Sequence, residues 1–231
     1  MGWLRVACRA MRNQFAAGFF APILLPVMDS LPLITPPAAA IVLAAGNSSR
    51  LGQPKQLLVY QGETLLHRAV RTALAAGYAP VVVVTGALDA ELRLAVAGLP
   101  CQAVHNPGWA AGMGASIRAG LAALGPAATA VLVMSSDQPL IEAAALAALA
   151  QHQQATGAPA VAAAYAEAFG IPALFAAGAL AGLRNLRPEQ GAKPLLASYG
   201  PTLALVPIPE AAFDVDTPAA YQALLAHRGP K

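Results

Sequence analysis

Three groups of residues in this chain combine the types and spacing that phosphate chemistry requires. The first follows the apolar run at residues 41–45, where Gly46 and Ser48 lead to the cationic residues Arg50 and Lys55. A glycine lets the backbone approach a ligand closely, and hydroxyl, guanidinium and ammonium groups bind phosphate oxygens. An apolar run that breaks into such a loop predicts a phosphate-binding turn after a buried strand. The alternative is an ordinary glycine- and serine-rich turn with two solvated cations.

The second group lies in the stretch 105–121, at the start of an expected helix. Gly112 and Gly114 leave little side-chain bulk there, and Ser116 falls in the first helical turn, among backbone amides that lack helical partners. A flat ring could enter such a place, so we expect Gly112 and Ser116 to line a base pocket. The alternative is a glycine-rich turn with Ser116 as a helix cap, and for Trp109 in this stretch we favour core packing.

The third group consists of acidic residues near the ends of expected strands. Asp137 follows the apolar run 131–134, and Asp214 and Asp216 precede the last expected helix. Such carboxylates suit a hard cation such as Mg²⁺, which keeps several waters and bridges phosphate oxygens. Alternation places Asp214 and Asp216 on one face, and we rank Asp216 first because it abuts the helix start. The alternative is that Thr217 or Asp216 serves as a helix cap before Pro218.

Apolar strand-like runs alternate with helical patterns from residue 40 onward. We expect strands at 40–44, 81–85, 102–105, 130–134, 160–163 and 203–206, and helices at 65–76, 89–97, 115–124, 141–154, 177–184, 192–199 and 217–226. This alternation predicts a single α/β domain with a doubly wound, Rossmann-like and mostly parallel sheet. Ligands bind such sheets beyond the carboxyl ends of the strands, which is where the three groups fall.

The sequence motifs of this chain are similar to those of a known family. The opening loop is neither a Walker loop nor a G-x-G-x-x-G dinucleotide loop. Its pattern, L-A-A-G-x-S-x-R-x-G-x-P-K-Q-L-L, resembles the opening loop of nucleotidyltransferases that use CTP or GTP. The match is best to the molybdenum cofactor cytidylyltransferase family, which is related to molybdopterin guanylyltransferase and has a MobA-like NTP transferase domain. Four further motifs resemble those of the same family: N-P-x-W, G-M-G-x-S-I-R-x-G-L, D-Q-P and D-V-D-T-P.

The resemblance implies roles for individual residues. Nucleotide contacts are implied for Leu43, Ala44, Ala45, Gly46, Ser48, Arg50, Lys55, Gly112 and Ser116; catalytic roles for Arg50, Lys55 and Asp137; and Mg²⁺ ligation for Asp137 and Asp216. Acceptor contacts are implied for Gly170, Pro172, Gly191 and Lys193, through words similar to G-x-P-x-L-F and D-x-G-A-R-x-L-L. Here the chain departs from the pattern, with Gln190 at the acidic position and Lys193 in place of arginine. Lysine cannot make the bidentate contact with phosphate that arginine makes. The identity of the acceptor is therefore inferred from the weakest of the motif matches.

The implied reaction moves CMP from CTP to the terminal phosphate of molybdenum-molybdopterin and releases pyrophosphate. CTP is favoured over GTP because the related guanylyltransferases usually have L-A-G-G, and the Ala45 methyl takes space that a purine would use. One alternative is transfer to another phosphorylated small molecule, such as an isoprenoid precursor or a sugar phosphate. Another is a non-catalytic molybdenum cofactor chaperone. A nicotinamide-dependent oxidoreductase is disfavoured by the missing G-x-G-x-x-G loop.

Composition limits the class of protein. Of 231 residues, 57% are hydrophobic and 11% charged, which excludes disorder over most of the length. The net charge is +3, and residues 1–37 contribute +2 of it, so the remainder carries only +1. Without a cluster of Lys and Arg, we expect no nucleic-acid binding. Two distant cysteines, Cys8 and Cys101, form no disulfide framework, which favours a cytoplasmic protein.

The first 37 residues stand apart from the rest. Arg5, Arg9 and Arg12 precede an apolar run at 15–28, an order typical of a secretion signal. Because prolines break this short run, we expect no stable membrane association. We therefore predict an N-terminal extension at 1–37, which is disordered or an over-extended start with the ordinary start at Met28, and an NTP transferase domain at 38–231. The alternative for the first 37 residues is a true signal peptide. The expected partners are CTP, molybdopterin, and a molybdoenzyme or its chaperone.

Overall fold

The computed structural model describes residues 38–46, 48 and 51–227. The expectations for residues 1–37 and for Arg50 lie outside the described residues. No helix in the described ranges is long and apolar enough to cross a membrane.

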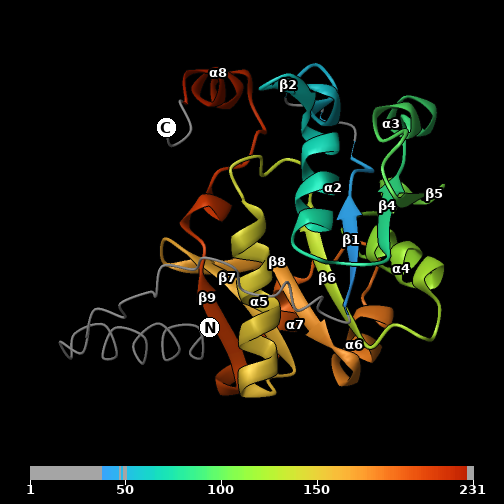
Figure 1. The fold of residues 1–231 in the computed structure, drawn as a ribbon. Coiled ribbons are helices and arrows are strands. Elements are labelled where there is room, and N and C mark those ends of the chain that lie inside the picture. Colours follow the sequence, from blue (N-terminus) through green and yellow to red (C-terminus); the bar gives the residue numbers. More distant parts are fainter. Residues whose placement is uncertain (1–37, 47, 49–50, 228–231) are drawn as a thin grey trace. The chain divides into compact units, whose positions relative to one another are not determined.

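A seven-stranded sheet forms the centre of the fold (Figure 1). Its strands are β1 (Ala39–Leu43), β4 (Val81–Thr85), β5 (Cys101–His105), β6 (Ala130–Ser135), β7 (Ala160–Tyr165), β8 (Ala168–Ala176) and β9 (Leu203–Pro207). Their spatial order is β5-β4-β1-β6-β8-β7-β9, and every pairing is parallel except those that β8 makes with β6 and β7. The predicted α/β class with a mostly parallel sheet is confirmed.

Helices cover both faces of the sheet. The helices α2 (Leu65–Ala75), α3 (Asp89–Ala95) and α5 (Ala143–Thr156) pack on one face, and α4 (Met113–Leu124), α6 (Leu180–Arg184) and α7 (Lys193–Ser198) pack on the other. Successive strand residues point to opposite faces, so Ala40 and Val42 contact the first layer while Ile41 and Leu43 contact the second. Burial on both faces explains the uninterrupted apolar runs.

A smaller apolar cluster joins a hairpin to the last helix. The hairpin strands are β2 (Val59–Tyr60) and β3 (Glu63–Thr64), and the helix is α8 (Pro218–Ala226). Tyr60, Val215 and Leu224 are buried together in this cluster. The segment before α8 is thereby packed with the hairpin. Short 3-10 turns complete the described chain: η1 (Lys55–Leu57), η2 (Trp109–Ala111), η3 (Ala177–Ala179), η4 (Gly200–Thr202) and η5 (Pro209–Ala212).

Two elements were not predicted from the sequence, the β2–β3 hairpin and the antiparallel strand β8. The hairpin strands are two residues each, too short to show a periodic pattern. Within β8, Gly170 and Pro172 are residues that usually interrupt a strand. The pairing with β7 shifts register between Ala162 and Ala163, which face Ala173 and Gly170 respectively. Pro172 therefore lies at a bulge, where the ladder needs no donor from it.

Candidate functional site

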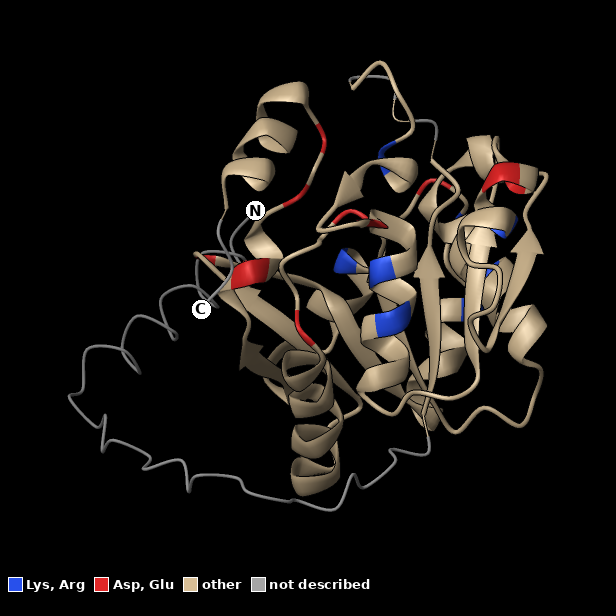
Figure 2. Cartoon of the chain, turned by 45° about the horizontal axis from the view of Figure 1, so that its top comes forward, with Lys and Arg blue, Asp and Glu red and all other residues tan. Residues whose placement is uncertain are grey.

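Three charged residues from distant parts of the chain meet at one point. The Lys55 ammonium donates a hydrogen bond to Asp216 Oδ1 at 2.7 Å and also contacts Asp137 Oδ2. Lys55 belongs to η1, Asp137 follows β6, and Asp216 precedes α8. A backbone hydrogen bond of 2.9 Å from Val215 to the Asp137 carbonyl holds the two acidic segments together. Figure 2 shows acidic residues in the stretch that leads into α8.

Burial and charge both act on this cluster. The side chains of Lys55, Asp137 and Asp216 are 19%, 10% and 35% exposed. Burial alone would lower the pKa of Lys55, but the charges and hydrogen bonds of Asp137 and Asp216 outweigh it and raise the pKa above 10.5. Lys55 is therefore protonated at neutral pH. Asp214 as a whole residue is exposed, yet burial of its carboxyl and the charges of Asp137 and Asp216 raise its pKa to about 6.

Asp137 keeps one oxygen available. Its Oδ1 is buried and has no hydrogen-bond partner within the described part of the chain. A buried acceptor without a partner is costly, so this oxygen suits a cation or a donor brought by a ligand. The described residues contain no group of three or more His, Cys, Asp or Glu that could hold a metal. A divalent cation at Asp137 and Asp216 would therefore complete its shell with water or phosphate oxygens, as Mg²⁺ commonly does.

Asp216 is not the N-cap of α8. Thr217 is the N-cap of α8, and its hydroxyl accepts a hydrogen bond from the Ala220 amide at 3.2 Å. Pro218 occupies the first helical position. Because Thr217 caps the helix, the Asp216 carboxylate can face Lys55.

A buried glutamine holds the loop after β1. Gln56 is 1% exposed, and its Nε2 donates to the carbonyls of Ala44 at 2.8 Å and Gly46 at 2.7 Å. The Ser48 hydroxyl accepts from the Lys55 amide at 3.0 Å. Sequence reasoning did not assign Gln56 a role, although it lies in the P-K-Q-L-L word. Its contacts show that it shapes the loop on which the predicted phosphate contacts lie.

Replacing Gln56 should loosen this loop. Gln56→Met keeps the side-chain length but leaves two carbonyl oxygens without their donor, so we expect the free energy of unfolding to fall by about 2–4 kcal/mol. Urea unfolding followed by circular dichroism measures the change. Gln53→Met is the matched control, because Gln53 is exposed in the same loop. Equal stability of the two variants would contradict the role of Gln56.

The residues at the end of β1 are enclosed. Leu43, Ala44 and Ala45 are all buried. Little of their surface is therefore open to a ligand in this structure. Gly46, in contrast, is exposed.

The predicted base-pocket residues have partners within the protein. Ser116 is 4% exposed and accepts a hydrogen bond from Asn106 Nδ2 at 3.1 Å, and it does not cap α4. Gly112 has φ +122°, and a Cβ there would lie 2.7 Å from the Pro188 carbonyl oxygen. Trp109 packs on Gly86, where a Cβ would come within 2.8 Å of the indole. The Gly112 loop therefore lies against the segment at 187–190, which precedes α7.

Gly114 makes the tightest of these approaches. A Cβ at this position would lie 2.1 Å from the Arg187 carbonyl oxygen and 2.8 Å from that of Gln190. Because both neighbours are backbone atoms, Gly114→Ala must move the segment at 187–190, and we expect a loss of about 2–4 kcal/mol in unfolding free energy. Gly178→Ala, where a Cβ meets nothing within 4 Å, is the control. Comparable melting temperatures for the two variants would contradict this packing.

The predicted acceptor residues lie on two elements. Gly170 and Pro172 are buried within β8, and a Cβ at Gly170 would meet the Tyr165 hydroxyl at 2.5 Å. Gly191 and Lys193 lie at the start of α7. Lys193 is exposed and so can reach a ligand. The acceptor assignment stays a prediction.

Comparison with known proteins identifies the family. The family model described as the MobA-like NTP transferase domain matches residues 40–203. The chain belongs to this family. The resemblance predicted from the sequence motifs is confirmed at that level.

Curated proteins with different names are similar to this chain. The nicotine blue oxidoreductase of Paenarthrobacter nicotinovorans is 43% identical over 111 residues, covering 47% of this chain and 52% of that protein. The probable molybdenum cofactor guanylyltransferase of Opitutus terrae is 40% identical over 108 residues, covering 46% and 50%. The chain thus spans about half the length of these curated relatives.

A solved structure matches over a longer span. Rv0371c from Mycobacterium tuberculosis superposes with a TM-score of 0.71 at 31% identity, covering 82% of this chain and 98% of that one. A further structure of Rv0371c, described as a complex with manganese, has a TM-score of 0.67 at 28% identity and covers 83% and 99%. The shared fold therefore extends through nearly the whole of that protein.

Proposed function

We propose that this chain is a cytoplasmic nucleotidyltransferase that moves CMP from CTP to the terminal phosphate of molybdenum-molybdopterin and releases pyrophosphate. The observation that carries the proposal is the position of Lys55 between Asp137 and Asp216, beside the loop that follows β1. Membership of the MobA-like NTP transferase family supports the reaction class. The name of the Opitutus relative supports a molybdenum cofactor as the acceptor.

The chemistry requires charge neutralisation more than covalent help. An acceptor phosphate oxygen attacks the α-phosphorus of CTP, and the bond from that phosphorus to the bridging oxygen of pyrophosphate breaks. Positioning and electrostatic stabilisation supply most of the catalysis in phosphoryl transfer, and we extend this to nucleotidyl transfer. Protonated Lys55 would offset the charge of the triphosphate and the departing pyrophosphate. Arg50 would add a second positive charge from the same loop.

We assign the metal-binding role to Asp137 and Asp216. The available Oδ1 of Asp137 and the opposing Asp216 carboxylate fit a hard divalent cation. Bound there, Mg²⁺ would neutralise phosphate charge. Because Lys55 contacts both carboxylates, its ammonium would shift toward the phosphates when the ion binds. The manganese complex described for Rv0371c supports a divalent cation in this fold.

The nucleotide and acceptor can be tested together. We expect pyrophosphate release to be fastest with CTP and molybdenum-molybdopterin, in a panel that crosses CTP and GTP with molybdopterin, an isoprenoid phosphate and a sugar phosphate. A preference for GTP would overturn the choice of base, which rests on the alanine at position 45. A different best acceptor would overturn the assignment of molybdenum-molybdopterin. Tight binding of molybdopterin without pyrophosphate release from any pair would favour a chaperone. If the transferase assignment holds, the recipient of the product would be a molybdoenzyme or its chaperone.

An oxidoreductase is the second candidate, favoured by the name of the Paenarthrobacter relative. The chain lacks the G-x-G-x-x-G loop that cradles a dinucleotide. We therefore expect no saturable change in NADPH fluorescence on titration with the protein. A saturable change with micromolar affinity, together with consumption of NADPH by a redox substrate, would replace the transferase proposal.

A further inference from the structure

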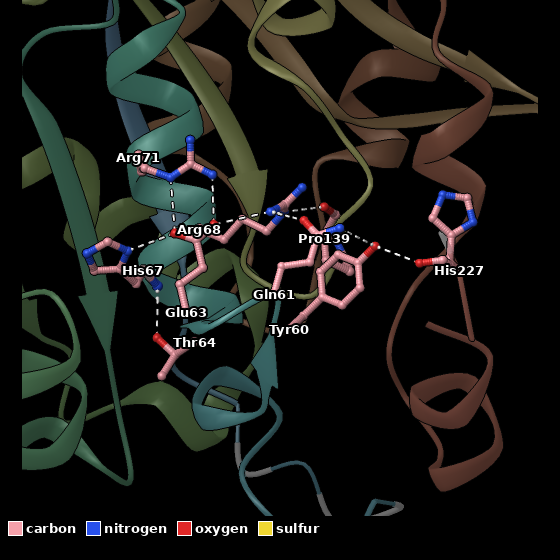
Figure 3. A network of polar contacts seen from close by, with 9 residues as sticks. All are labelled: Tyr60, Gln61, Glu63, Thr64, His67, Arg68, Arg71, Pro139 and His227. Atoms are coloured by element: carbon pink, nitrogen blue, oxygen red, sulfur yellow. Dashed lines mark hydrogen bonds and ion pairs between the residues drawn. The ribbon is translucent and has the colours of Figure 1, made fainter. Parts of the chain in front are cut away.

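A second polar network lies on the hairpin β2–β3 and the first turns of α2 (Figure 3). Arg68 is at its centre. Its Nε donates to the Pro139 carbonyl at 2.7 Å, and its Nη1 donates to Gln61 Oε1 at 3.2 Å and Glu63 Oε1 at 3.1 Å. The guanidinium also lies over the ring of buried Tyr60, 5.2 Å from its centroid. These contacts fix both the position and the plane of the Arg68 head group.

Glu63 anchors this network with a permanent negative charge. Arg71 donates to Glu63 Oε1 at 2.7 Å and to Oε2 at 3.0 Å, and His67 Nδ1 lies 3.0 Å from Oε2. The hydrogen bonds from Arg71, followed by those from His67 and the nearby arginine charges, outweigh burial and lower the pKa of Glu63 to about 2. Arg68 therefore has an ionised partner at every pH at which the protein would be assayed.

Pro139 belongs to the loop that carries Asp137. On one side this loop is held by Gln138, whose Nε2 donates to the Ala211 carbonyl at 2.9 Å, and by the Val215 amide on the Asp137 carbonyl. Arg68 holds it from α2, on the side of the hairpin. The hairpin begins at Val59, shortly after Lys55 in η1. Arg68 thus connects the segment that follows Lys55 to the loop that carries Asp137.

We infer that Arg68 is a positioning residue of the candidate site, which holds the Pro139 carbonyl so that the Asp137 carboxylate keeps its place against Lys55 and Asp216. The effect on turnover rests on the proposed function; the effect on the loop does not. A lysine could satisfy Glu63 but could not also present a planar donor to Pro139, because its ammonium is a single point charge.

The competing explanation is that the network merely fastens the hairpin to α2. Arg71 separates the two explanations, because it shares Glu63 with Arg68 but makes no contact with Pro139 among the interactions described. Loss of Arg71 removes two charged hydrogen bonds from the network and leaves the Asp137 loop untouched. Arg71→Ala is therefore the matched control for Arg68→Ala.

The test compares Arg68→Ala, Arg68→Lys and Arg71→Ala in the full chain. Hydrogen exchange measured by mass spectrometry reports on residues 136–141 and 213–217, and pyrophosphate release gives kcat and KM for CTP. For both Arg68 variants we expect exchange about 10-fold faster in those two segments and a kcat about 10–100-fold lower, with the KM for CTP within about 3-fold of the parent. For Arg71→Ala we expect exchange and kcat within about 2-fold of the parent.

Equal effects of Arg68→Ala and Arg71→Ala on the two segments would overturn the inference, and so would parental exchange and turnover in Arg68→Lys. If Arg68→Ala does not fold, the hydrogen exchange and turnover of Arg68→Lys test the inference in its place. If the parent chain releases no pyrophosphate with any substrate pair, the proposed function fails, and the exchange data still decide whether Arg68 holds the Asp137 loop.

Discussion

Asp137→Asn should reduce Mg²⁺-dependent pyrophosphate release by about 1,000-fold or more while leaving the protein folded. The substitution keeps the shape of the side chain but removes the charge that faces Lys55 and that would hold the cation. Lys55 retains Asp216, at 2.7 Å, so its ammonium is not left buried without a partner. Turnover is measured as pyrophosphate formed from CTP over a series of Mg²⁺ concentrations, and folding by the melting temperature.

Glu142→Gln provides the control for this prediction. Glu142 is exposed, and like Asp137 it lies between β6 and α5. Its loss changes the net charge by the same amount without touching the cluster, so we expect turnover within about 2-fold of the parent. Parental turnover in Asp137→Asn would exclude the metal assignment. Unfolding of that variant would instead indicate a structural role for the carboxylate.

The fold could be predicted where local pattern and burial agree. The strand at Val81–Thr85 has the predicted bounds, because a run of valines that is covered on both faces differs sharply from its flanking turns. In β8 the local signal and the structure disagree. Gly170 and Pro172 are residue types that favour loops over strands. The segment is a strand because it pairs with β6 on one side and β7 on the other. That pairing depends on contacts distant in sequence, which local periodicity does not contain.

The candidate site could be predicted in outline but not in its internal contacts. The rule that ligands bind at the carboxyl ends of strands correctly placed Lys55, Asp137 and Asp216 in one region. Lys55 contacts both acids directly, although it lies 82 positions from Asp137 and 161 positions from Asp216 in the sequence. No motif spacing predicts contacts between residues so far apart. The assignment of Gly112 to a base pocket stays a prediction, and its sequence neighbours gave no sign that it packs closely against the segment at 187–190.

Lys55→Met should lower turnover by about 100-fold or more and also destabilise the protein. Without the ammonium, the carboxylates of Asp137 and Asp216 repel each other in a partly buried site. Because Asp216 is about one-third exposed, we expect a loss of about 2 kcal/mol in unfolding free energy, less than for a fully buried pair. A divalent cation would supply the missing positive charge, so millimolar Mg²⁺ should restore part of this stability. Urea unfolding with and without Mg²⁺ measures both effects.

A second substitution at Lys55 separates charge from geometry, and a substitution at Lys193 serves as the stability control. Lys55→Arg keeps the positive charge, so we expect it to retain most of the stability that Lys55→Met loses. Its planar guanidinium cannot occupy the place of a single ammonium between two carboxylates, so turnover should still fall by about 10-fold or more. Lys193→Met removes an exposed lysine and should leave the unfolding free energy within about 0.5 kcal/mol of the parent. If Lys55→Met were as stable as Lys193→Met and unaffected by Mg²⁺, the acids could not form the mutually repelling, cation-binding pair on which the proposed reaction depends.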